Sequence, residues 1–140
     1  MGENVSRLER GAHLVGAYLD ATIGKLGLTQ GEAHVLAQVA LHGPVSIAIL
    51  HHEFGHKRST LTNLLDRLEK RKLLRREINR ADRRSIVVNL TPAGERAARE
   101  VTNALDKLER QLAGQVGKSD IAGLHRVVAA LEKAVQHKPG

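Results

Sequence analysis

The sequence has no cysteine and no tryptophan, and it has only one phenylalanine and one tyrosine. Without cysteine there is no disulfide, no thiol catalysis and no cysteine redox sensor. Because aromatic residues are so few, the core has to be built from leucine, valine, isoleucine and alanine. No apolar run approaches the roughly 18 residues that span a bilayer, and no signal peptide opens the chain. We therefore expect a cytoplasmic protein without a membrane partner.

Signatures of catalysis are also missing. The sequence contains no nucleophile elbow of the G-x-S-x-G type, no P-loop and no dinucleotide-binding fingerprint. Its glycines cluster at expected helix ends, where backbone geometry explains them. Carboxylates such as Glu95, Glu100 and Asp106 fall on the polar sides of expected helices. We therefore expect neither enzyme activity nor a cofactor.

The informative part of the sequence lies between Lys57 and Gly94. Four leucines recur there at i, i+3, i+4 and i+7, a spacing that predicts a helix with one apolar stripe. They are Leu61, Leu64, Leu65 and Leu68. The other face carries short polar or forked side chains of the kind that reach base edges. These are Ser59, Thr60, Thr62, Asn63 and Arg67.

Two short strands are predicted after this helix, at residues 75–79 and 85–90. In the second strand the apolar side chains of Ile86, Val88 and Leu90 alternate with other residues, as in a strand with one buried face. The residues between the strands, 80–84, are too charged for a core. They predict an exposed loop.

The positive charge of the protein is concentrated in this same region. Residues 56–84 hold eleven lysines and arginines against four acids, a net charge of +7. The rest of the chain is balanced, so this segment accounts for the whole net charge of +7. A solvated helix face normally mixes charges of both signs. Clustered Lys and Arg are the main source of affinity for nucleic acid, so the segment predicts polyanion binding.

At these residues the sequence resembles the MarR family of winged helix-turn-helix transcriptional regulators. The family's wing signature is D-x-R, three residues, V-x-L-T, two residues and G. Every position is filled here, by Asp82, Arg84, Val88, Leu90, Thr91 and Gly94. The preceding segment, LLDRLEKRKLLRR, resembles the family's recognition helix and its exit. The resemblance extends over roughly residues 5–137.

The resemblance implies a mainly α-helical fold, with a winged helix-turn-helix core and a two-stranded β wing. Within one domain of 140 residues, the DNA-binding unit would cover residues 28–94, flanked by dimerisation helices in residues 1–27 and 95–140. Apolar residues spaced by three or four over residues 5–26 form a seam that needs a covering surface. In the family this helix packs on a second subunit, so we expect a homodimer.

Three helix starts are predicted by capping residues. Thr29 with Glu32 three residues later forms a capping box. Ser46 caps a short helix, and Thr91 caps the helix after the wing. The resulting order of a short helix, a turn and a basic polar helix is that of a helix-turn-helix motif.

The predicted function is that of a transcriptional regulator that binds specific double-stranded DNA. The resemblance implies a ligand-responsive repressor with a palindromic operator. The expected base contacts are made by Ser59, Thr60, Thr62 and Asn63, with Arg58 and Arg67 on phosphate or guanine and Lys70 on phosphate. In the wing, Arg83 or Arg84 would reach the minor groove, while Asp82 would pair with the Arg84 guanidinium and hold its direction.

A small-molecule effector would bind, by the same resemblance, between the dimerisation helices and the winged unit. The candidate residues for that site are His13, Tyr18 and His34. Ordinary surface or packing positions explain each of these three residues equally well. The sequence does not indicate which ligand would bind.

Two alternatives are weighed against this interpretation. The first is a metal-responsive repressor. His52 and His56 are one helical turn apart, and His34 falls about where some relatives in the family have a zinc-ligating histidine. Those relatives carry a second histidine pair after the wing, and no histidine lies between Arg84 and Leu124 here, so no metal is expected. The second alternative is an architectural protein that binds DNA with little sequence preference.

Overall fold

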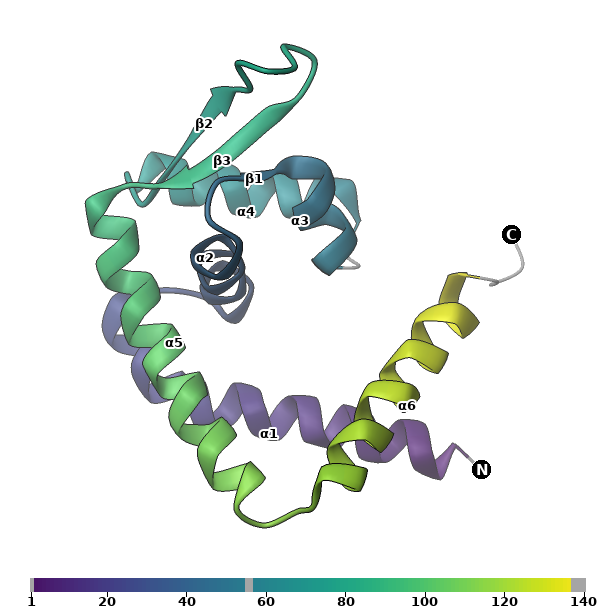
Figure 1. Ribbon diagram of the computed structural model, residues 1–140. Coiled ribbons are helices and arrows are strands. Elements are labelled where there is room, and N and C mark those ends of the chain that lie inside the picture. The colour runs from purple at the N-terminus through teal and green to yellow at the C-terminus, as the bar shows by residue number, and fades with distance from the viewer. Residues whose placement is uncertain (1, 55–56, 137–140) are drawn as a thin grey trace. The chain divides into compact units, whose positions relative to one another are not determined.

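The computed structural model describes residues 2–54 and 57–136 of the chain (Figure 1). The elements are α1 (Glu3–Leu26), α2 (Gln30–His42), β1 (Val45–Ser46), α3 (Ile47–Phe54), α4 (Arg58–Lys70), β2 (Leu74–Ile78), β3 (Ile86–Leu90), α5 (Pro92–Ala113) and α6 (Lys118–Gln136). They form two compact units, residues 1–105 and 106–140, so that α5 begins in the first and ends in the second. The predicted mainly helical fold is confirmed.

The predicted capping residues end and start the helices of the first unit. Gly27 closes α1 in the left-handed conformation, with φ of 66°. The Thr29 hydroxyl accepts from the Glu32 N–H at 3.2 Å, and the Thr29 N–H donates to the Glu32 carboxylate at 2.9 Å. Ser46 accepts from the N–H of Ile49 at the start of α3. These local contacts fix the sharp corner between α1 and α2 and the entry to the helix-turn-helix.

One apolar core holds the first unit together, and it is aliphatic as the composition requires. The leucine stripe of α4 is fully in it, since all four leucines are at most 5 % exposed. The remaining large members come from α1, the residue after Gly27, α2, α3, the sheet and α5: Ile23, Leu28, Val35, Leu36, Val39, Val45, Leu50, Leu74, Val88, Leu90 and Val101. This core therefore positions the recognition helix and the base of the wing.

The sheet has three antiparallel strands in the order β1-β3-β2. The two predicted wing strands are β2 and β3, each shifted from its predicted bounds by one residue at one or both ends. The sequence analysis did not predict β1, whose two residues pair with Val87 and Val88. A two-residue strand carries no period to detect. It anchors the base of the wing, and beyond it the wing is a two-stranded ribbon.

The wing and α5 are joined by a close backbone approach. A Cβ on Gly94 would lie 1.7 Å from the carbonyl oxygen of Leu73, a distance that no side chain permits. The Thr91 hydroxyl donates to the carbonyl of Lys72 at 2.6 Å and accepts from the Gly94 N–H at 3.0 Å. The last two positions of the wing signature, Thr91 and Gly94, therefore fasten the start of α5 to the start of β2.

A left-handed residue ends α4. The N–H groups of Lys72 and Leu73 donate to the carbonyls of Glu69 and Leu68, which is the Schellman arrangement at a helix C-terminus. Lys72 has φ of 62°, a conformation that glycine adopts without strain and that lysine adopts at a cost. The chain thus keeps a strained lysine directly after the basic helix.

The second unit consists of the end of α5 and the helix α6, and α6 has no buried residue. Its apolar side chains are exposed, namely Leu124, Val127, Val128, Leu131 and Val135. In the first unit, α1 also exposes Val5, Leu14 and Val15. No helix of the described residues is long and apolar enough to cross a membrane.

Candidate nucleic-acid interface

The recognition helix α4 presents one row of polar side chains opposite its buried leucines. Ser59, Asn63, Asp66 and Lys70 follow each other at i, i+4, i+7 and i+11, so they share one face of the helix. All four are exposed. We call these residues the outward row. The base-reading candidates Ser59 and Asn63 lie in it, as does the phosphate candidate Lys70.

Thr60 and Thr62 are also exposed and lie on either side of the outward row. The Thr62 hydroxyl donates to the Arg58 carbonyl at 3.0 Å within the helix. Its donor is therefore engaged, and its oxygen remains available to accept from a base.

Arg67 is drawn toward α2. Its Nε lies 3.8 Å from a carboxylate oxygen of Glu32, which is buried with 6 % of its side chain exposed. Glu32 is also the capping-box residue of α2. The predicted contact of Arg67 with phosphate or guanine remains a prediction, and this ion pair competes with it.

Arg71 ties the end of α4 to the end of α1. Its two terminal nitrogens donate to the carbonyl oxygens of Gly27 and Leu26, each at 2.8 Å. These carbonyls belong to the last turn of α1, where helix geometry leaves them without partners and where positive charge is favourable. The sequence analysis counted Arg71 only as part of the basic segment.

Arg76 of β2 ties the wing to α4. Its Nη2 lies 2.6 Å from Oδ1 of Asp66 and 2.8 Å from Oε1 of Glu69. Its backbone N–H donates to the other Glu69 oxygen at 3.2 Å. The hydrogen bond from Arg76 holds the pKa of Glu69 below its ordinary value, and the same bond raises the pKa of Arg76. We call these three residues the wing clasp.

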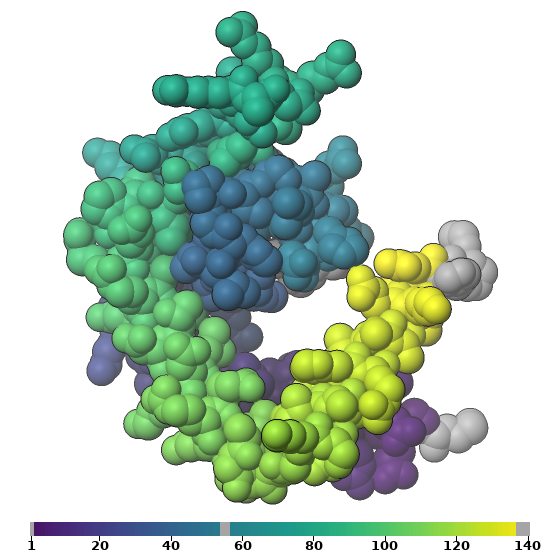
Figure 2. Space-filling model, in the orientation of Figure 1, coloured from purple at the N-terminus to yellow at the C-terminus, as the bar shows by residue number. Residues whose placement is uncertain are grey.

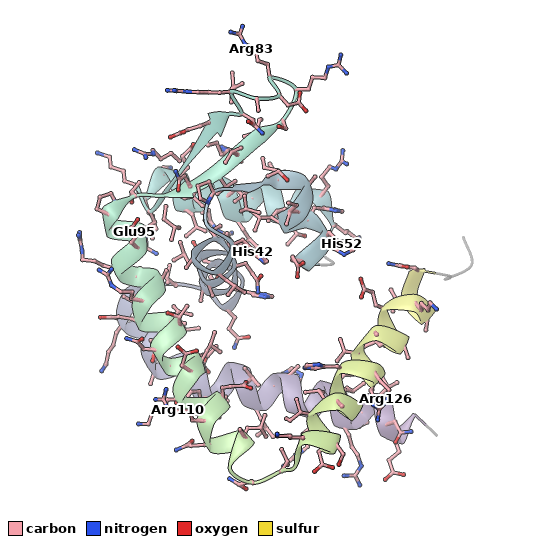
Figure 3. All side chains as sticks on the ribbon, in the orientation of Figure 1. His42, His52, Arg83, Glu95, Arg110 and Arg126 are labelled. Atoms are coloured by element: carbon pink, nitrogen blue, oxygen red, sulfur yellow. The ribbon has the colours of Figure 1, made fainter. Side chains whose placement is uncertain are left out.

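The tip of the wing is held by its own hydrogen bonds. The Asp82 carboxylate accepts from the backbone N–H of Arg84 at 3.1 Å, and the Asp82 carbonyl accepts from Ser85. Asp82 thus engages the backbone of Arg84, whereas the sequence analysis expected its guanidinium, and no ion pair joins these two described residues. A tight turn brings the carboxylate back to the nearest N–H before the long side chain. Figure 3 shows Arg83 extending outward from the tip.

Within residues 57–84, all of which the structure describes, seven basic side chains form no ion pair and no side-chain hydrogen bond. They are Lys57, Arg58, Lys70, Lys72, Arg80, Arg83 and Arg84. They flank α4 at both ends and surround the tip of the wing, which Figure 2 shows standing clear of α2 and α3. Lys57, Lys72 and Arg80 were not among the predicted contacts, although the charge count included them.

The three predicted effector residues lie on two helices of the first unit, and their role stays a prediction. His13 and Tyr18 lie on α1, and His34 lies on α2, where its ring is 3.5 Å from the Gln38 amide. A cleft of about 310 Å³ lies elsewhere in the first unit, between α2, the end of β3 and the start of α5. Val39, Leu90 and Ala98 are buried beneath it, and Glu95 and Arg99 are exposed beside it; Figure 3 shows Glu95 at the start of α5.

Metal ligands are not gathered in the part of the chain that the structure describes. No group of three or more His, Asp or Glu side chains there could hold an ion. His52 is described, but the second histidine of the weighed pair, His56, lies outside the described residues.

Comparison with known proteins finds a family match within the first unit. Residues 28–86 match the model of the MarR family. Over these residues the chain is similar to the MarR family. The match covers the helix-turn-helix, β2 and the tip of the wing and ends at the first residue of β3, so it includes the candidate interface.

Individual relatives agree with this assignment. The HTH-type transcriptional repressor MdtR of Bacillus subtilis is 35 % identical over 77 residues, which are 55 % of this chain and 50 % of MdtR. The crystal structure of the transcription regulator MarR from Oenococcus oeni has a TM-score of 0.85 at 22 % identity, over 94 % of this chain and 99 % of that one. That of a MepR–DNA complex from Staphylococcus aureus has a TM-score of 0.74 at 21 % identity, over 92 % and 96 %.

The curated relatives are matched over only part of their length. The chain spans about half the length of the first curated relatives it matches. The solved structures share the fold, and the family model matches residues 28–86.

Proposed function

We propose that this protein is a transcriptional regulator of the MarR family that binds specific double-stranded DNA. One observation carries the proposal: the outward row of α4 and the tip of the wing are polar and exposed, and the seven unpaired cations surround them. The match of residues 28–86 to the MarR family supports a regulator and no enzyme, because MarR-family proteins are transcription regulators. A related fold occurs in complex with DNA in MepR.

In this mechanism α4 enters the major groove. Ser59 and Asn63 of the outward row, with Thr60 and Thr62 beside it, contact base edges. Arg58 and Lys70 contact phosphates near the two ends of the helix. The wing lies in the adjacent minor groove, where Arg83 or Arg84 inserts and the Asp82 turn holds the backbone of Arg84.

The protein acts as a homodimer in this proposal, because α6 alone leaves five large apolar side chains exposed. Residues 1–27 and 95–140 supply the dimerisation helices. A two-fold dimer presents two recognition helices, which have to be one helical repeat apart, roughly 34–36 Å, to read a palindrome. The exposed apolar side chains of α1 and α6 support this assembly.

Repression relieved by a small molecule is the finer part of the proposal. The curated relative MdtR is named a repressor, which supports the sign of regulation. His13, Tyr18 and His34 remain the candidate effector contacts. Ligand binding that changes the spacing of the two recognition helices would release the operator.

Selection of bound sequences from a random duplex pool tests the proposal. A regulator should prefer its selected palindrome over random DNA by roughly 10³-fold or more, whereas an architectural protein should prefer it far less. Asn63→Ala should relax the preference at particular positions, and Lys70→Ala should weaken all sequences about equally. Lys118→Gln, a lysine at the start of α6, is the control and should change neither. A selected pool without a consensus would contradict the proposal.

A further inference from the structure

The wing of this protein extends beyond the part of the sheet that a third strand supports. Only Val87 and Val88 of β3 pair with β1, and the ribbon from Ile78 to Ile86 has two strands. A two-stranded ribbon is marginal by itself in water, so its direction depends on what holds its base. Ile78 and Ile86, which pair near the tip, are both exposed and add no packing against the core.

The wing clasp is the contact between the recognition helix and this ribbon. Arg76 lies in β2 two residues before Ile78, and β2 is an outer strand of the sheet. Both oxygens of Glu69 are used, one by the Arg76 guanidinium and one by its N–H, so the helix is bonded to the side chain and the backbone of the strand. Arg76 is half-buried, with 27 % of its side chain exposed.

Asp66 adds a second anchor from the outward row. Its bond to Arg76, at 2.6 Å, is the shorter of the two ion pairs, and Asp66 would otherwise place an unpaired negative charge on the face proposed to meet DNA. Charge-assisted bonds to a planar guanidinium fix direction as well as distance. The helix and the wing are thereby held in one relative orientation.

We propose that Arg76 is a positioning residue, whose bonds to Asp66 and Glu69 set the wing so that its arginines and the outward row engage one duplex together. The inference rests on the proposed DNA-binding function. Arg76 itself need not touch DNA. Its contribution to affinity passes through Arg83 and Arg84 at the tip.

A mutant cycle separates positioning from a direct contact. Arg76→Gln should weaken binding to a selected duplex about tenfold, as losing a wing contact would. In an Arg83→Ala/Arg84→Ala background the same substitution should cost almost nothing, because the wing has lost the groups that were being positioned. Arg75→Gln is the matched control, since Arg75 pairs only with Glu77 of its own strand and is 57 % exposed. Equal losses in both backgrounds, or an equal loss in the control, would overturn the proposal.

The acidic partners provide a test with the opposite change of charge. Asp66→Asn/Glu69→Gln makes the surface more positive and, by charge alone, should tighten binding to DNA. If the clasp positions the wing, this variant binds the selected duplex more weakly, while Glu77→Gln does not. Tighter binding by the double variant would overturn the proposal even if Arg76→Gln fails to fold.

A measurement without DNA keeps this inference apart from the proposed function. The absence of native cysteine allows spin labels at Lys70→Cys and Arg80→Cys, diluted with excess unlabelled protein. Electron-electron distance measurements should show a broader helix-to-wing distribution for Arg76→Gln than for the native clasp or Arg75→Gln. An unchanged distribution would refute the clasp. Failure of the unaltered protein to select any duplex, with a broadened distribution, would refute only the DNA-binding function.

Discussion

The two units of the chain differ in where their apolar side chains lie. In the first unit, leucines and valines from four helices and three strands converge in one core, and the stripe of α4 is almost completely buried. In the second unit, α6 has the same aliphatic composition at helical spacing and no buried residue. The same kind of sequence pattern therefore builds a core in the first unit, and in α6 it leaves apolar side chains exposed, which the proposed dimer would cover.

The largest effect that tests this comparison is expected in α6. Leu124→Glu/Leu131→Glu should raise the dissociation constant of the dimer by about 10⁴-fold or more, because four leucines per dimer would each forgo roughly 1.5–3 kcal/mol. Sedimentation equilibrium measures this change. Leu41→Glu is the control, since Leu41 is 74 % exposed and belongs to the other unit. If the unaltered protein is a folded monomer at micromolar concentration, the proposal that the apolar side chains of α6 are covered in a dimer is wrong.

The core of the first unit should respond within the fold itself. Leu68→Ala, at a fully buried position of α4, should lower the free energy of unfolding by about 3–4 kcal/mol through lost burial and a cavity. Urea unfolding at one fixed protein concentration measures the change. Leu41→Ala makes the same chemical change at an exposed position and should cost less than about 0.5 kcal/mol. Similar losses at both positions would contradict the burial pattern.

The bond between α1 and α4 should have a smaller effect. Arg71→Ala removes two charge-assisted hydrogen bonds, and because the guanidinium is exposed the expected loss is about 1 kcal/mol. Amide hydrogen exchange should quicken in the last turn of α1. Arg75→Ala, which leaves α1 untouched, should not change that exchange. Unaltered exchange in Arg71→Ala would mean that the bond does not hold the turn.

One substitution in the basic region should stabilise the protein. Lys72→Gly relieves the left-handed backbone and should raise the free energy of unfolding by about 1 kcal/mol, less what the positive charge contributes at the helix end. Thermal unfolding detects this as a rise in Tm. Lys70→Gly, inside α4, should lower Tm instead. A fall in Tm for both variants would show that the strain at Lys72 is negligible.

The wing clasp should make stability weakly dependent on pH. The pKa of Glu69 is held below its ordinary value of 4.5, so its contribution is present above that value and is lost as the pH falls through the depressed pKa. Glu69 keeps 41 % of its side chain exposed to solvent, which screens the interaction, so the contribution is a few tenths of a kcal/mol at most. Comparing the unfolding of the native protein with Glu69→Gln between pH 6 and pH 3 measures it. A constant difference over that range would contradict the depressed pKa.

Local chemistry made much of the fold predictable. The capping box of Thr29 and Glu32 and the leucine stripe of α4 depend on residues within one or two turns, and both are confirmed. The wing signature was recognised through its spacing, and Gly94 shows its physical cause in the contact with Leu73.

The missed contacts join residues that the sequence does not bring together. The bond from Arg71 to Leu26 spans 45 residues, and that from Arg76 to Asp66 spans ten. A charge count does not distinguish one arginine of the basic region from another. The fold does, because it bonds Arg71 and Arg76 to distant residues and leaves Arg83 and Arg84 without such bonds. Asp82 was misassigned for a related reason, because turn geometry favours the nearest N–H over a long side chain.

Arg71 couples the recognition helix to the C-terminal end of α1. A ligand that displaced the Arg71 guanidinium from the carbonyls of Leu26 and Gly27 would remove a contact that holds α4. If that loss weakened DNA binding by some factor, thermodynamic linkage requires bound DNA to weaken the binding of the ligand by the same factor. Communication between the two would need no moving pathway of many residues. The Arg71 guanidinium, bonded to the last carbonyl groups of α1, would transmit the effect of the ligand to the DNA site and the effect of DNA to the ligand site.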